Sequence, residues 1–187
     1  MSIKNSTISI PSGLIVLLGG ARSGKSSLAV ELACQSNHDV YFIATAEARD
    51  EDMKQRIARH KVERPNWTTI EEPIDLPGAI KNCPSNSLII IDCLTLWISN
   101  LMLAGYDQTK IRTASTKSIS QIATRISPSL VISNEVGLGL VPDTVIGREY
   151  RDVLGQINQQ WVRAAKNSLF LVAGKAFSLT NPKELLV

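Results

Sequence analysis

The segment that most constrains the fold is a glycine-rich loop that follows directly on a short apolar run. Residues 14–18 are all apolar, and a helix-like segment, residues 27–34, follows the loop. Between them lies the pattern Gly-x4-Gly-Lys-Ser. A strand that leads through this pattern into a helix typically binds the phosphates of a nucleoside triphosphate. Glycine permits backbone conformations in which successive N–H groups surround a phosphate, and the helix start adds partial positive charge. The predicted nucleotide-binding loop comprises Gly19, Gly20, Ala21, Arg22, Ser23, Gly24, Lys25 and Ser26.

Two members of this loop have predicted chemical roles. Lys25 would reach the outer phosphates, where charge builds up during transfer, and we predict it to be catalytic. The Ser26 hydroxyl would hold Mg²⁺. A second apolar strand, residues 87–92, ends in Asp92, and a carboxylate there is the usual partner of a phosphate loop at the Mg²⁺ site. The alternative is a glycine-rich turn without a ligand, which the complete motif between strand and helix disfavours.

Strand-like and helix-like segments alternate along the chain. We predict strands at residues 14–18, 40–45, 67–71, 87–92, 130–135 and 168–173. We predict helices at residues 27–34, 47–61, 76–81, 94–102, 119–126 and 144–167. The polar residues 106–117 fit either a loop or an exposed helix. The alternation predicts an α/β fold of the P-loop NTPase type, with a mainly parallel sheet and helices on both faces. We predict one nucleotide-binding domain over residues 1–187, in which residues 1–12 form an N-terminal extension.

Composition argues against several classes of protein. The net charge is +3 without a basic block, and aromatic residues make up 5% of the chain, so we expect no nucleic-acid partner. No apolar run reaches the roughly 18–20 residues of a membrane span, so we expect no transmembrane segment. The polar N-terminus lacks the apolar core of a signal peptide. The cysteines, Cys34, Cys83 and Cys93, show no CxxC spacing and fit reduced thiols in a cytoplasmic protein.

Two further groups suggest chemistry beyond nucleotide binding. His60 follows Arg56 by about one helical turn, and a histidine near a bound triphosphate can act as a nucleophile on phosphorus. The alternative is a histidine with a structural role. Asn134 and Glu135 end a predicted strand before a glycine-punctuated loop that could approach a ligand closely. The alternative there is an ordinary strand-to-helix turn. The charged residues 148–152 fit a solvated helix face.

Several of these blocks, taken together, resemble one enzyme family. The phosphate loop is followed by Ile-Ala-Thr-Ala at residues 43–46, Arg-Ile-x-x-His at 56–60 and Arg-Pro-x-Trp at 64–67. The second half adds Asp-Cys-Leu-Thr at 92–95 and Asn-Glu-Val-Gly-x-Gly-x-Val-Pro at 134–142. This order of blocks is similar to that of the adenosylcobinamide kinase/adenosylcobinamide-phosphate guanylyltransferase family.

The resemblance implies a bifunctional enzyme of adenosylcobalamin biosynthesis. The family phosphorylates adenosylcobinamide with ATP or GTP, and then transfers GMP from GTP to adenosylcobinamide phosphate through a GMP-histidine. The family histidine corresponds to His60, while the other histidine, His38, lies in a predicted turn. The family forms homotrimers with sites between subunits. We expect this chain to form a similar homotrimer. We also expect Asn134 and Glu135 to contact the acceptor substrate. We expect further nucleotide contacts from Ala44, Thr45, Ala46, Lys61, Val62, Glu63, Arg64, Glu71 and Asp92.

The residues themselves leave two other classes of function open. One is a monofunctional P-loop small-molecule kinase, in which His60 is structural and no covalent nucleotide intermediate forms. Substrate-dependent ADP formation without a GTP-dependent adduct would favour it. The other is a regulatory ATPase or GTPase, which would hydrolyse slowly and act on a protein partner. A nucleic-acid-remodelling ATPase fits the small net charge and few aromatic residues less well.

Overall fold

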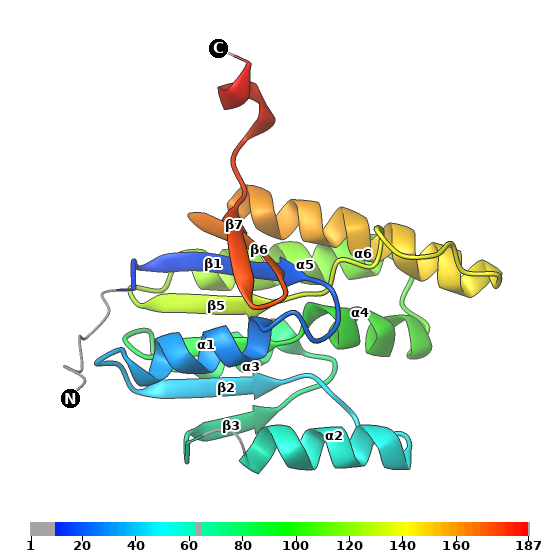
Figure 1. The fold of residues 1–187 in the computed structure, drawn as a ribbon. Coiled ribbons are helices and arrows are strands. Elements are labelled where there is room, and N and C mark those ends of the chain that lie inside the picture. The colour runs from blue at the N-terminus through cyan, green and yellow to red at the C-terminus, as the bar shows by residue number, and fades with distance from the viewer. Residues whose placement is uncertain (1–9, 63–64, 187) are drawn as a thin grey trace.

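The computed structural model describes residues 10–62 and 65–186, except for the side chains of residues 56 and 60. Residues 1–9 of the predicted N-terminal extension lie outside the described part. Figure 1 shows strands and helices alternating along the chain. The strands are β1 (Gly13–Gly19), β2 (Val40–Ala44), β3 (Thr68–Glu71), β4 (Leu88–Asp92), β5 (Pro128–Ile132), β6 (Asn167–Val172) and β7 (Lys175–Ser178). The helices are α1 (Lys25–Cys34), α2 (Glu51–Val62), α3 (Leu76–Asn82), α4 (Leu94–Leu103), α5 (Gln108–Ala123), α6 (Val145–Ala164) and the 3₁₀ helix η1 (Pro182–Leu185).

The strands form one sheet in the order β3-β2-β4-β5-β1-β6-β7. Strands β1 to β6 pair in parallel, and β7 returns antiparallel to β6. The parallel strands therefore all end at one edge of the sheet, toward which their arrowheads point in Figure 1. This arrangement confirms the predicted α/β fold with a mainly parallel sheet. It also brings the predicted site residues at the strand ends to the same edge.

Helices cover the two faces of the sheet unequally. On one face, α3, α4, α5 and α6 surround a core that contains the fully buried Trp97. On the other face, α1 packs through Ala29 and Ala33. Strand β4 lies between both layers, so every side chain from Leu88 to Ile91 is buried, alternately on one face and the other. Of the helices that the structure describes, none combines the length and apolar content needed to span a bilayer.

Helix α5 includes most of the polar segment that the sequence left open. The Asp107 carboxylate caps its N-terminus by accepting a hydrogen bond of 2.8 Å from the Lys110 N–H. The helix therefore begins well before the predicted residue 119, and it ends at Ala123. Its buried face includes Ser115 and Ser118, and these small polar residues weaken the apolar periodicity that would have identified the helix.

Candidate active site

The predicted phosphate loop joins β1 to α1 at the C-terminal edge of the sheet. Its backbone turns sharply, with φ angles of +147° at Gly19, +57° at Arg22 and +102° at Gly24. Two of these three positions are glycine, which adopts positive φ angles without steric cost. Gly24 is also the N-cap of α1. The loop thus has the turned backbone and the adjoining helix start by which phosphate groups are bound.

The Lys25 side chain lies inside the loop. It is 6% exposed, and its Nζ donates hydrogen bonds of 2.6 Å to the Gly20 carbonyl oxygen and 3.2 Å to the Ser23 Oγ. A buried ammonium group needs such partners because desolvation penalises its charge. The loop therefore holds a positive charge at its centre, next to N–H groups that also favour an anion.

Neighbouring strands support the loop on two sides. The Glu135 N–H donates to the Gly19 carbonyl oxygen at 3.1 Å, which attaches the segment after β5. The Gly174 N–H, in the β6–β7 turn, donates to the Ser23 carbonyl oxygen at 3.0 Å. The β6–β7 turn was not predicted from the sequence, and its Ala173-Gly174 pair has positive φ angles typical of a two-residue hairpin. The shape of the loop thus depends on contacts far apart in the sequence.

We expect Gly19→Ala to lower the free energy of unfolding by about 2–4 kcal/mol. A Cβ atom at Gly19 would lie 2.3 Å from the Leu171 carbonyl oxygen and 2.8 Å from the Ser23 Oγ, and the φ angle would be strained for alanine. Gly20→Ala is the matched control, because a Cβ there meets no described atom within 4 Å. Urea denaturation measures both variants. Equal unfolding midpoints would contradict this account of Gly19.

Three of the predicted residues lie in one row across the sheet. Glu71 pairs with Ala44, and Ala44 pairs with Asp92. The row continues through Ile132 to Leu17 of β1, two residues before the loop begins. Asp92 and Leu17 are two strands apart, a separation of about 10 Å. The pairing therefore places the Asp92 carboxylate near the loop, and Glu71 farther along the same edge.

Ser26 and Asp92 together fit Mg²⁺ that is also bound by nucleotide phosphates. Ser26 is in the first turn of α1. Alternation along β4 points Asp92 to the same face of the sheet as Leu88 and Ile90, which α1 covers. No group of three or more His, Cys, Asp or Glu side chains among the described residues could hold a metal ion. Mg²⁺ commonly uses one or two protein ligands and completes its shell with phosphates and water, so this sparse donor set suits it.

Thr45 has a structural contact that the sequence did not reveal. Its side chain is fully buried, and its hydroxyl accepts from the Cys93 N–H at 2.8 Å and donates to the Cys93 carbonyl oxygen at 2.7 Å. The buried Asn100 amide donates to the Thr45 carbonyl oxygen at 2.7 Å. These bonds hold the end of β2 against the end of β4. Thr45 thus shapes the edge of the sheet, between Ala44 and the partly exposed Ala46.

A buried polar network fixes the end of β5. The Asn134 N–H donates to the Thr95 Oγ1 at 2.8 Å, and its carbonyl oxygen accepts from the Asn158 amide at 3.0 Å. The Tyr150 hydroxyl donates to the Thr95 carbonyl oxygen at 3.1 Å, and burial raises the pKa of this phenol, which keeps it a donor. The half-buried Asn134 side chain makes no hydrogen bond to another described residue. The Glu135 carboxylate accepts from the Gly137 N–H at 2.7 Å.

The predicted nucleophile lies on α2, near its C-terminus. The backbone of His60 belongs to this helix, but its side chain lies outside the described part of the protein. Two predicted nucleotide contacts, Glu63 and Arg64, also lie outside the described residues. None of the described α2 side chains is buried. The described side chains of helix α2 therefore add nothing to the buried core of the protein.

The remaining predicted contacts form a separate group at the β3 edge. Lys61 makes an ion pair with Glu71, which joins α2 to the end of β3, and Val62 is 86% exposed. Figure 1 shows α2 beside β3, at the opposite side of the sheet from β6 and β7. Strand β3 lies four strands from β1 in the sheet order, which is about 19 Å. The structure thus assembles the loop, Asp92 and the β5 end, and leaves Lys61, Val62 and Glu71 at a distance.

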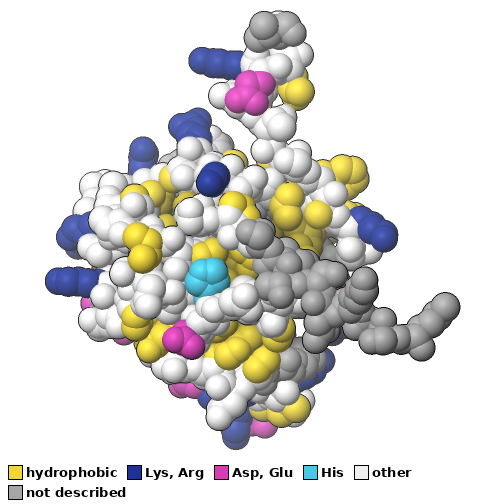
Figure 2. Space-filling view, turned by 90° about the vertical axis from the view of Figure 1, so that its left-hand side faces the viewer, with side chains coloured by type: hydrophobic (Ala, Val, Ile, Leu, Met, Phe, Trp, Pro, Cys, Tyr) yellow, Lys and Arg dark blue, Asp and Glu magenta, His cyan; other side chains and the backbone are white. Residues whose placement is uncertain are grey.

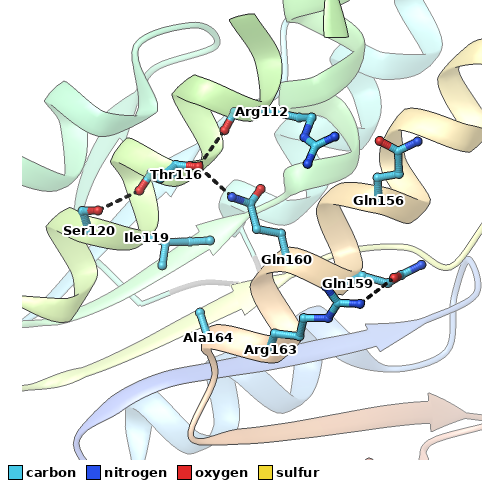
Figure 3. Close-up of a pocket in the computed structure, with 9 residues that line it drawn as sticks. All are labelled: Arg112, Thr116, Ile119, Ser120, Gln156, Gln159, Gln160, Arg163 and Ala164. Atoms are coloured by element: carbon cyan, nitrogen blue, oxygen red, sulfur yellow. Dashed lines mark hydrogen bonds between the residues drawn. The ribbon is translucent and has the colours of Figure 1, made fainter. Parts of the chain in front are cut away.

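One cavity lies away from these residues. It measures about 600 Å³, lies between α5 and α6, and includes Arg112 and Arg163 among its lining side chains (Figure 3). It contains no predicted site residue, so we do not assign it to the nucleotide. Figure 2 looks onto the edge where the parallel strands begin, and the basic side chains visible there are spread around the rim. The phosphate loop lies at the opposite edge, after the end of β1, and the chemistry is expected there.

Comparison with known families identifies the chain. A family model described as cobinamide kinase / cobinamide phosphate guanyltransferase matches residues 15–179, from β1 to just past β7. The chain belongs to this family. The bifunctional adenosylcobalamin biosynthesis protein CobP of Pseudomonas aeruginosa is 40% identical over 163 residues, which cover 85% of this chain and 92% of that protein. The bifunctional adenosylcobalamin biosynthesis protein CobU of Escherichia coli is 33% identical over 175 residues, or 86% and 96% of the two chains. The resemblance seen in the sequence blocks is confirmed.

Solved structures agree with the fold of this family member. Flagellar accessory protein FlaH from Methanocaldococcus jannaschii is 16% identical with a TM-score of 0.50, over 90% of this chain and 78% of that one. The RadB recombinase is 16% identical with a TM-score of 0.51, over 86% and 74%. At such low identity these likenesses concern the fold alone, and they support the predicted α/β fold with a mainly parallel sheet.

Proposed function

We propose that this chain phosphorylates adenosylcobinamide and then transfers GMP from GTP to the product, which gives adenosylcobinamide-GDP in adenosylcobalamin biosynthesis. The observation that carries the proposal is the phosphate loop with Lys25 at its centre, in a chain whose family is named for both reactions. Both reactions start from a nucleoside triphosphate. One phosphate site at the C-terminal edge can therefore serve both, with ATP or GTP in the first and GTP in the second.

In the kinase step, the loop acts mainly by electrostatics. The acceptor hydroxyl oxygen attacks the γ-phosphorus and its proton passes to water, the bond to the bridging oxygen of the β-phosphate breaks, and a nucleoside diphosphate leaves. Lys25 and the loop N–H groups stabilise the negative charge that moves onto the leaving oxygens. Mg²⁺, held by Ser26 with Asp92, would supply further charge neutralisation. Asn134 and Glu135 lie beside the loop and would orient the acceptor.

In the guanylyl step, His60 acts as the nucleophile. A neutral imidazole nitrogen attacks the α-phosphorus of GTP, the bond to the β-phosphate oxygen breaks, and pyrophosphate leaves. A phosphate oxygen of adenosylcobinamide phosphate then attacks the same phosphorus, the phosphorus–nitrogen bond breaks, and His60 is regenerated. Two displacements by well-placed groups replace one reaction between two anions. Lys61, Val62, Glu63, Arg64 and Glu71 would hold the guanine nucleotide near His60.

The position of α2, beside β3, affects how His60 could reach a nucleotide at the phosphate loop. With β3 four strands from β1, His60 reaches the nucleotide either when α2 moves toward the loop or when a neighbouring subunit brings the two together. The sparse packing of α2 is compatible with both. We propose that the protein is a cytoplasmic homotrimer with its sites between subunits. This assembly would give His60 a route to the nucleotide without a change in the core of the sheet.

Intact-protein mass spectrometry tests this proposal. After incubation with GTP and Mg²⁺, we expect a mass gain of one GMP that is lost on acid treatment, because a phosphorus–nitrogen bond is acid-labile. Addition of adenosylcobinamide phosphate should remove the adduct and yield adenosylcobinamide-GDP. Product formation with ATP and adenosylcobinamide alone, without any adduct from GTP, would instead favour the monofunctional kinase.

A further inference from the structure

An exposed apolar segment stands beside the phosphate loop. We call residues 138–146, between the end of β5 and the first turn of α6, the apolar arm. Figure 1 shows this region extending beyond the rest of the body, at the end of the sheet where the strand arrows point. Large contiguous exposed apolar surfaces typically mark binding sites in water-soluble domains. The exposed fractions are 78, 96, 63, 73 and 59% for Leu138, Leu140, Val141, Val145 and Ile146.

The backbone of the apolar arm is held in place. Arg148 donates hydrogen bonds to the carbonyl oxygens of Pro142 and Asp143, at 3.0 and 2.8 Å. Arg151 donates to the carbonyl oxygen of Gly137 at 2.8 Å. The charged residues 148–152, which from sequence fitted a solvated helix face, therefore include two arginines that fasten this loop. Because the backbone is fastened while the apolar side chains face outward, the arm presents a preformed surface.

The arm begins next to the reacting groups. The Glu135 N–H is bonded to the Gly19 carbonyl oxygen at 3.1 Å, so the start of the segment is fixed at the phosphate loop. Leu138 follows three residues later, and three residues of extended chain span at most about 11 Å. An acceptor whose reacting group lies at the loop would therefore have the rest of its body over the apolar arm.

We propose that the apolar arm binds the corrin ring of the acceptor substrate. This inference rests on the proposed function. The acceptor must place a small hydroxyl or phosphate group at the loop, while its much larger macrocycle, with many methyl and methylene groups, stays outside. The five outward side chains of the arm are aliphatic and uncharged, which suits this apolar surface. Asn134, at the root of the arm, would contact a polar side arm of the ring.

Serine substitutions in the arm test the inference. We expect Leu140→Ser to raise the KM for adenosylcobinamide about tenfold, the factor that corresponds to lost burial of one leucine side chain. The double variant Leu138→Ser/Leu140→Ser should raise it further, and Leu140→Phe should retain most of the affinity. The KM for GTP and the yield of the GMP adduct should stay unchanged. Because both leucines are exposed, the substitutions remove no core packing.

The matched control is Ile126→Ser, since Ile126 is 69% exposed but precedes β5 at the other edge of the sheet. An unchanged KM for the acceptor in both arm variants would overturn the inference. A smaller assembly by light scattering in those variants would also overturn it, because the arm would then cover a second copy of the chain. A wild-type protein that has neither activity would instead overturn the proposed function.

Discussion

His60→Ala should form no GMP adduct with GTP and should lose guanylyl transfer by about a thousandfold or more, the scale expected when a nucleophile is removed. The Lys61–Glu71 ion pair ties α2 to the end of β3, which lies four strands from β1 and its phosphate loop, so the contacts of the loop with a triphosphate should persist. GTP affinity and phosphorylation of adenosylcobinamide should therefore stay near the wild-type values. Helix α2 contributes no described buried side chain, so the fold should tolerate the change. Adduct mass, product chromatography and GTP titration on one preparation measure all three quantities.

His38→Ala is the matched control for this variant. It removes the other histidine of the chain, which precedes β2 at the edge of the sheet away from the loop. We expect it to form the adduct and both products at wild-type rates. A full yield of adduct on His60→Ala would contradict the assignment of the nucleophile. Loss of both activities together in that variant would contradict the separation of the two steps.

Short-range signals made much of the fold predictable. The apolar runs at β1 and β4 are buried on both faces of a parallel sheet, so their hydrophobic residues are continuous and easy to recognise. The loop after β1 needs glycine at two positions with positive φ angles, and these positions, Gly19 and Gly24, are the two glycines of the sequence motif. The same local logic placed Asp92 and Asn134 at strand ends, and parallel pairing then brought both to one edge.

Long-range order was harder to predict. Nothing in the sequence of α2 indicates that its neighbour β3 will be four strands from β1, because strand order depends on contacts between distant segments. The sequence blocks predict His60 at the nucleotide, and within one chain α2 is joined to β3 through the Lys61–Glu71 ion pair. The place of His60 at the nucleotide therefore stays a prediction. The buried network of Asn100 and Asn158 was missed for a similar reason. Polar residues inside helices look solvent-exposed until their partners, such as Thr45 and Asn134, are known.

Lys25→Ala should impair both reactions, whereas His60→Ala should impair one. Removing the ammonium group takes away a charged partner of the outer phosphates, worth about 1.5–3 kcal/mol, so GTP affinity should fall about tenfold to a hundredfold. Both rates should fall by about a hundredfold or more, because the same charge stabilises the leaving oxygens. Titration with GTP and steady-state assays of each step measure these effects. Urea denaturation checks that the substitution has not destabilised the domain. Lys81→Ala, an exposed lysine at the end of α3, is the control and should change neither. Full GTP affinity in the Lys25→Ala variant would contradict the assignment of the loop to the nucleotide site.

If Lys25→Ala impairs both reactions while His60→Ala impairs only guanylyl transfer, one phosphate site serves both reactions. A monofunctional kinase would lack the guanylyl reaction altogether, and a regulatory switch would lack the acceptor-dependent products in every variant.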